Sequence, residues 1–61
     1  MTGEEFKRWM GAVGLNKAQT ARTLNLSRNS VAKYELEGAP VSIAYACAAI
    51  AAGLKPWGSG E

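Results

Sequence analysis

The sequence predicts an all-α fold of four short helices packed as one compact domain. Residues that cap helices precede the predicted helices, apolar residues recur with helical spacing, and no segment alternates with period two. A chain of 61 residues forms a single domain that buries about 60% of its unfolded surface. We expect this domain over residues 1–57 and a flexible tail over residues 58–61.

The first helix is expected over residues 3–13. Thr2 and Glu5, three residues apart, form a capping-box pattern at its start, and Gly14 is placed to end it. The apolar residues of this segment lie on one helical face: Phe6, Trp9, Met10 and Val13.

The second helix is expected over residues 17–24, with Asn16 as N-cap and Gln19 as its box partner. Its inner face contains small and apolar residues: Ala18, Ala21 and Leu24. Asn25 follows, and asparagine tolerates the left-handed conformation that a sharp turn requires. Two helices joined by a tight turn are therefore expected here, with Leu26 as the apolar anchor of the turn.

The third helix is expected over residues 28–36, capped by Ser27 and followed by a break at Gly38 and Pro40. The helical period turns Val31 and Tyr34 toward the core. The same period places four residues on the opposite, outer face: Arg28, Asn29, Ala32 and Lys33.

The fourth helix, over residues 42–52, is apolar nearly all round, which predicts burial on more than one side. It either closes the core or packs on its twin in a second subunit. We favour the dimer, because four helices offer few partners to cover so apolar a helix. The expected interface residues are Tyr45, Ile50, Leu54 and Trp57. The apolar stretch over residues 43–54 is too short to span a bilayer.

Composition argues against an enzyme. Cys47 is the only cysteine and the chain has no histidine, so no disulfide and no metal-ligand cluster is expected. No set of acid–base and nucleophilic residues is present, and neither a cofactor nor a small-molecule ligand is expected. The polar, acidic N-terminus does not resemble a signal peptide, which favours a cytoplasmic protein with a reduced thiol.

Positive charge is concentrated in one half of the chain. The net charge is only +2, but residues 6–34 contain six basic residues and no acidic one. A cationic segment that also holds two helices and a tight turn indicates binding to duplex DNA. Arg22 is as well suited to an ion pair with Glu35 or Glu37 as to DNA.

The outer face of the third helix suits the major groove. Arg28 can bind guanine and Asn29 adenine, Lys33 a guanine or a phosphate, and Ala32 a thymine methyl group. The positive end of the second helix suits a phosphate. Asn16, Lys17 and Gln19 surround that end and are predicted to contact the DNA backbone, as is Ser30.

The segments 14–19, 24–31 and 34–35, with Ala21, resemble the lambda-repressor-like (Cro/repressor, xenobiotic-response-element type) helix-turn-helix family. Residues 39–57 are similar to a branch of small regulators in that family. The resemblance implies that the third helix is the recognition helix and that homodimers repress at palindromic operators. By position it implies base contacts for Arg28, Asn29 and Lys33, and backbone contacts for Lys17 and Ser27.

Thr20 stands where this family usually has a core leucine, and its hydroxyl is expected to bond a carbonyl one turn back. Asn25 stands in place of the usual turn glycine, and Gly38 is displaced by one position from the usual glycine.

The sequence thus predicts a regulator that binds a pseudo-palindromic DNA operator as a homodimer and represses by occupancy. The alternative is a protein-interaction module, such as an antitoxin-like partner, on the same fold. The polar, cationic face of the third helix favours DNA, because protein-docking faces are richer in aromatic residues and methionine.

Overall fold

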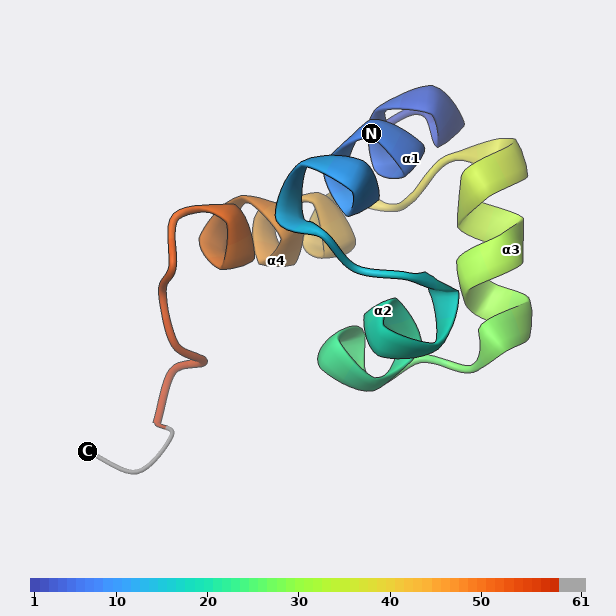
Figure 1. Ribbon diagram of the computed structural model, residues 1–61. Helices are drawn as coiled ribbons and strands as arrows, with labels where there is room; N and C mark the ends of the chain where they lie inside the picture. Colours follow the sequence, from blue (N-terminus) through green and yellow to red (C-terminus); the bar gives the residue numbers. More distant parts are fainter. Residues whose placement is uncertain (59–61) are drawn as a thin grey trace.

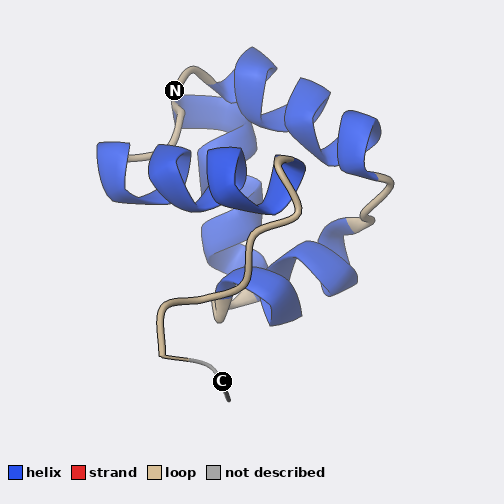
Figure 2. Cartoon of the chain, turned by 90° about the vertical axis from the view of Figure 1, so that its left-hand side faces the viewer, coloured by secondary structure: helices blue, strands red, loops and turns tan. Residues whose placement is uncertain are grey.

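The computed structural model describes residues 1–58 and is all-α over that range (Figures 1 and 2). The predicted all-α, four-helix fold is confirmed. The third helix extends one residue beyond its expected end, and the fourth begins and ends one residue earlier than expected. Of the predicted flexible tail, only Gly58 falls within the described residues. The helices are α1 (Gly3–Val13), α2 (Lys17–Leu24), α3 (Arg28–Glu37) and α4 (Val41–Ala51).

The helix starts follow the predicted local hydrogen bonds. The Thr2 hydroxyl accepts the Glu5 N–H at 3.1 Å, and the Glu5 carboxylate accepts the Thr2 N–H at 2.7 Å. Asn16 and Gln19 form the same reciprocal box before α2, and the Ser27 side chain caps α3. These caps satisfy N–H groups that the first turn of a helix leaves without partners.

The core lies where α1 packs against α3 and α4 and where α2 packs against α3. The Phe6 ring stacks on Trp9, with centroids 5.7 Å apart, and meets Tyr34 edge-on at 5.8 Å. The Trp9 Nε1–H donates to the Cys47 carbonyl at 2.9 Å and so joins α1 to α4. Every helix contributes a buried side chain, and the buried apolar residues are Phe6, Trp9, Met10, Ala21, Val31, Ala39 and Cys47.

Thr20 is the buried polar residue of this core, and it is fully inaccessible. Its Oγ1 atom has no hydrogen-bond partner among the described residues, so the expected bond to a carbonyl one turn back is wrong. The hydroxyl is enclosed with the side chain in the packed core, where a missing partner carries a desolvation penalty.

The turn between α3 and α4 is tied to the start of the chain. The Ala39 N–H donates to the Met1 carbonyl at 2.9 Å. Gly38 has φ 96° and ψ 167°, a conformation open almost only to glycine, and its backbone approaches Met1 closely. Gly3 lies against the Glu35 carbonyl, where a side chain would collide. Close backbone contacts therefore fix the C-terminal end of α3 against the start of α1.

The expectation that α4 is buried on more than one side is not met within a single copy of the described chain. Cys47 is its one buried residue, while Val41 and Tyr45 are 69% and 75% exposed. The physical reason is that α4 packs on α1 through one face, on the side of α1 away from α3 (Figure 1), and residues 1–58 leave its other face uncovered. Within the described residues, no helix has the length and apolarity needed to cross a membrane.

Candidate nucleic-acid interface

α2 and α3 form a compact pair joined by a left-handed turn. Asn25 has φ 56°, as the sharp turn requires, and the Leu26 N–H donates to the Ala21 carbonyl at 2.7 Å. In Figure 1 α2 is seen nearly end-on while α3 runs vertically, so the two helices cross steeply. Ala21 is buried in this pair, and its small side chain permits the close approach.

The N-terminal half of α3 presents its polar side chains to solvent. Arg28, Asn29 and Lys33 are exposed, and none of them makes a side-chain hydrogen bond or ion pair within residues 1–58. Ala32 is half-buried. The guanidinium and amide groups therefore present unused donors and acceptors, which are the groups that recognise base edges in a major groove.

Sequence reasoning missed Leu36 on this face. α3 continues through Glu37, so Leu36 lies on the helix, 84% exposed, one turn beyond Lys33 on the outer face. The signal was the spacing of four and three residues from Asn29 through Lys33 to Leu36, which continues one helical face. The sequence analysis placed Leu36 within the helix but did not assign it to the outer face.

The start of α2 is suited to a phosphate. The Asn16 Oδ1 accepts the Gln19 N–H at 2.8 Å, and the Gln19 Oε1 accepts the Asn16 N–H at 3.0 Å. Both side chains use their oxygens in the cap, so their NH₂ groups face solvent as donors. These donors lie at the positive end of the helix dipole, where anions are favoured.

The two predicted serines lie side by side at the start of α3. The Ser27 hydroxyl accepts the Ser30 N–H at 3.1 Å and donates its proton to the Ser30 Oγ, also at 3.1 Å. Only one of the two hydroxyl protons is used in this bond, so the other remains available to a phosphate.

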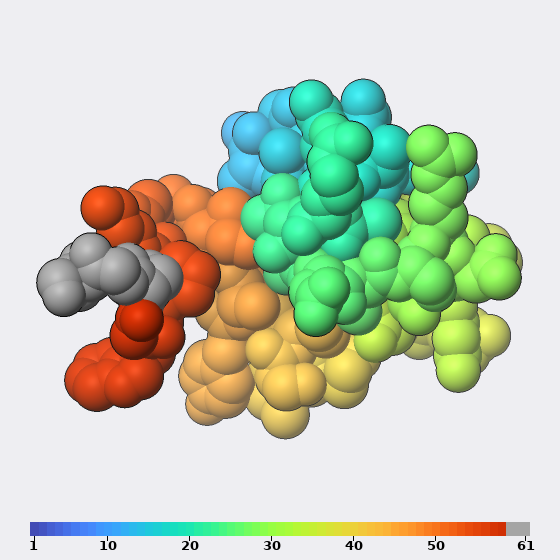
Figure 3. Space-filling view, turned by 90° about the horizontal axis from the view of Figure 1, so that it is seen from below, coloured from blue at the N-terminus to red at the C-terminus, as the bar shows by residue number. Residues whose placement is uncertain are grey.

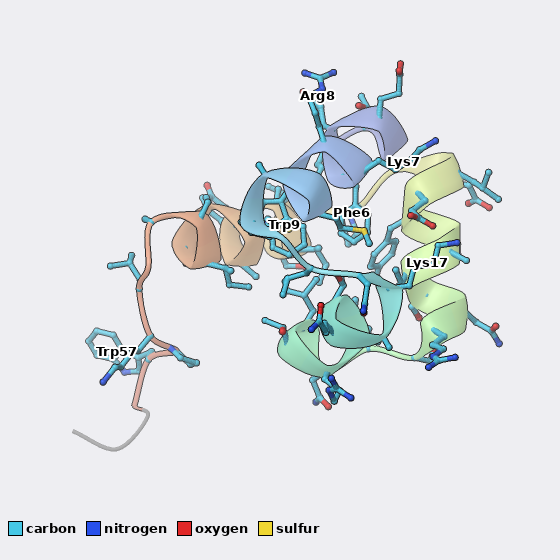
Figure 4. The ribbon with its side chains drawn as sticks, in the orientation of Figure 1. Phe6, Lys7, Arg8, Trp9, Lys17 and Trp57 are labelled. Carbon is cyan, nitrogen blue, oxygen red and sulfur yellow. The ribbon has the colours of Figure 1, made fainter. Side chains whose placement is uncertain are left out.

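Lys17 is already paired. Its Nζ lies 3.4 Å from the Glu35 Oε1, and the Glu35 side chain is only 15% exposed (Figure 4). Of the two roles left open for Arg22, the ion pair with Glu35 or Glu37 is not formed within residues 1–58, where Lys17 at the start of α2 is the partner of Glu35. The sequence predicted that Lys17 contacts a phosphate and did not indicate its ion pair with Glu35.

The basic side chains on α1 lie apart from those on α2 and α3. Lys7 and Arg8 lie on α1, and Figure 4 shows Arg8 projecting away from α2 and α3. The cationic segment defined by sequence is therefore not one continuous surface. Its interface part is limited to α2 and α3, and Arg8 belongs elsewhere.

The residues predicted for a dimer interface differ in exposure, although Ile50 and Leu54 line the same hollow between α2 and α4. Tyr45 is 75% exposed and Leu54 65%, and Trp57 is fully exposed. Ile50 instead packs half-buried against the core. The segment after α4, residues 53–58, is called the arm here. Figure 3 shows it extending beyond the end of α4.

The groups that could support redox or metal chemistry in the described chain are the Cys47 thiol and potential metal ligands. Burial raises the pKa of the Cys47 thiol, which disfavours its reactive thiolate. Residues 1–58 contain no cluster of three potential metal ligands. Comparison of the chain with family models, with curated proteins and with solved structures finds no match.

Proposed function

We propose that this protein is a sequence-specific duplex-DNA-binding regulator that acts as a homodimeric repressor, of phage or bacterial type, in the cytoplasm. The observation that carries the proposal is the exposed start of α3, where Arg28 and Asn29 offer unpaired polar groups beside the phosphate-suited start of α2. Bases and backbone are recognised by different groups in such an interface, and this surface contains both kinds.

The proposed roles follow from chemistry. Arg28 binds guanine through its guanidinium fork, and Asn29 pairs with adenine through its amide. Lys33, one turn further along α3, reaches a guanine or a phosphate, and the half-buried Ala32 contacts a thymine methyl group. The backbone contacts come from Asn16, Lys17, Gln19, Ser27 and Ser30, and they set the position of α3 without selecting sequence.

The homodimer is the second part of the proposal. Two copies related by a two-fold axis would place two recognition helices about 34 Å apart, one turn of DNA. Such a dimer recognises a pseudo-palindromic operator. Repression then follows from occupancy of the operator, because a protein bound there blocks access to a promoter.

The decisive experiment selects bound sequences from a random duplex pool and then measures fluorescence anisotropy at near-physiological salt. The selected duplex should show a palindromic consensus and bind at least about a thousandfold more tightly than its scramble. Equal, weak and strongly salt-dependent binding to both duplexes would instead reveal only non-specific attraction to the cations.

A second candidate function is a protein-interaction module, such as an antitoxin-like partner. The observation in its favour is Leu36, whose apolar side chain is 84% exposed on the outer face of α3. A Leu36→Ala variant separates the two functions, because it removes the apolar side chain without adding a charge to the face of α3 proposed to meet DNA. Loss of the partner with unchanged operator binding would support the protein-interaction function.

A further inference from the structure

An apolar groove runs between α2 and α4. It has a volume of about 410 Å³, the size of pockets that accept aromatic groups. α2 contributes Thr23 and Leu24, and α4 contributes Ile43, Ala46 and Ile50. No charged side chain of the described residues lines the groove, so it suits an apolar group as its ligand.

The arm borders this groove and carries the largest unburied side chain of the described residues. Leu54 and Pro56 form part of the groove wall, whereas the Trp57 ring is fully exposed and points into solvent (Figure 4). Figure 3 shows α2, α4 and the arm on the same side of the molecule. The chain therefore places an unfilled apolar groove next to an uncovered indole.

The backbone directs Trp57 away from its own groove. After α4, the Gly53 N–H donates to the Ile50 carbonyl at 3.0 Å and the Leu54 N–H to the Ala49 carbonyl at 2.9 Å. Gly53 has φ 76°, which turns the chain out of the helix. Pro56 then restricts the residue before it to an extended conformation.

A second copy of this chain is the occupant with the matching chemistry. Each copy carries both a groove and an exposed indole, which is the self-complementarity that a two-fold interface requires. Burying one tryptophan removes roughly 150–250 Å² from water, and reciprocal docking doubles that amount. The two tryptophans thus supply roughly 300–500 Å² of the about 1,200 Å² that a stable interface buries, and the groove walls and Leu54 of both copies supply the remainder.

We propose that two copies dimerise by arm exchange, with Trp57 of each copy docked in the α2–α4 groove of the other. This inference deepens the proposed function, because it rests on the homodimer and gives it a contact site. Thr23 and Leu24 connect the interface directly to the C-terminal end of α2, so the dimer orients the two helix pairs.

Sedimentation equilibrium of the full chain over a range of concentrations tests the exchange. Trp57→Ala should weaken self-association at least about thirtyfold, as expected for an aromatic anchor. Thr23→Arg, a charge at the exposed rim of the groove, should weaken it similarly. Ala12→Arg adds the same charge on the exposed surface of α1, outside the groove, and should leave association unchanged.

Tryptophan emission gives a second measurement on the same samples. Subtracting the spectrum of Trp57→Phe removes the signal of buried Trp9. The Trp57 emission should shift to shorter wavelength as the dimer forms. A monomer with a blue-shifted, concentration-independent signal, in which Trp57 fills its own groove, would overturn the exchange. So would a dimer in which Trp57 remains in water.

The two proposals fail separately. A dimer that binds its selected operator but tolerates Trp57→Ala and Thr23→Arg overturns arm exchange and leaves the DNA-binding function intact. A chain that exchanges arms but selects no duplex sequence overturns the DNA-binding function alone. Circular dichroism melts of each variant establish that the fold is retained.

Discussion

The Lys17 ammonium lies 3.4 Å from the Glu35 carboxylate, joining the first residue of α2 to the last turns of α3. The two helices of the proposed interface are thus held together at the point where a phosphate is expected to bind. The Lys17 side chain is 64% exposed and that of Glu35 only 15%, so Lys17 is the partner more accessible to a phosphate. A phosphate that recruits Lys17 must compete with Glu35.

Replacing Glu35 with glutamine should therefore strengthen binding to every duplex. Release of Lys17 from an exposed ion pair is worth about two- to fivefold in affinity. Anisotropy against the selected and scrambled duplexes measures the change. Glu37→Gln removes the same charge from the same helix at an exposed position that forms no ion pair with described residues. An equal gain in DNA affinity in both variants would show that the effect comes from net charge. It would contradict a competition between Glu35 and phosphate for Lys17.

Arg28→Ala should weaken binding to the selected duplex by about 1–3 kcal/mol and relax the preference at one base pair. Arg8→Ala is the matched control, because Arg8 carries the same charge but projects from α1 away from the interface (Figure 4). Competition titrations with duplexes varied at single positions separate the two effects. If both variants lose affinity equally for all sequences, Arg28 does not contact a base.

Thr20→Val should stabilise the fold. The valine keeps the shape of threonine but removes the buried hydroxyl that has no partner, a penalty of about 1–3 kcal/mol. For a domain of this size each kcal/mol raises Tm by about 4–8 °C. Thermal melts followed by circular dichroism measure the shift, and Thr20→Ser, which retains the hydroxyl, should not stabilise. An unchanged or lower Tm for Thr20→Val would mean that the hydroxyl is satisfied in solution.

Two glycines should respond in opposite directions to alanine. At Gly38, alanine faces a disfavoured φ of 96° and brings its Cβ within 2.7 Å of the Met1 carbonyl, which should cost at least about 1–3 kcal/mol. At Gly11, inside α1, the Cβ meets nothing within 4 Å, and alanine should stabilise by about 1 kcal/mol. Urea unfolding of the two variants gives the comparison. Similar midpoints would contradict the close approach of Gly38 to Met1.

The capping box of α1 predicts a specific acid sensitivity. The hydrogen bond from the Thr2 backbone lowers the pKa of Glu5, so the unfolded chain takes up this proton at higher pH than the folded chain. The stability that Glu5 contributes is therefore complete above the ordinary glutamate pKa and is lost as pH falls through the lowered value. Unfolding measured from pH 6 down to about pH 3 checks this.

Glu5→Gln keeps a side chain able to complete the box but removes the titration, so this part of the pH dependence should disappear. Glu4→Gln, an exposed change in the same turn, should leave it in place. If both variants retain the wild-type acid sensitivity, Glu5 does not carry it.

Local chemistry explains which features were predictable from sequence. The boxes at Thr2 and Asn16, the Ser27 cap and the left-handed Asn25 depend on residues within a few positions of each other, so the sequence was enough to place them. The polar outer face of α3 followed from helical period alone. The fold class rests on these short-range signals together.

The features that could not be predicted depend on packing between helices. The partner of Lys17 is set by how α2 lies against α3, which no local pattern specifies. α4 is apolar on all sides, so its periodicity gives no indication of which side faces α1, and its exposed face was expected to be buried. The groove beside Trp57 combines three separate segments and has no signature in any one of them.

The solitary thiol of Cys47 gives the molecule a built-in reporter of its own motions. It is 1% exposed, and its backbone carbonyl accepts the hydrogen bond of Trp9 that joins α1 to α4. A thiol reagent can modify it only when these two helices part, so the labelling rate measures how often they separate. No dye or engineered residue is needed to follow that opening in the unmodified chain, whether alone, with DNA or as a dimer.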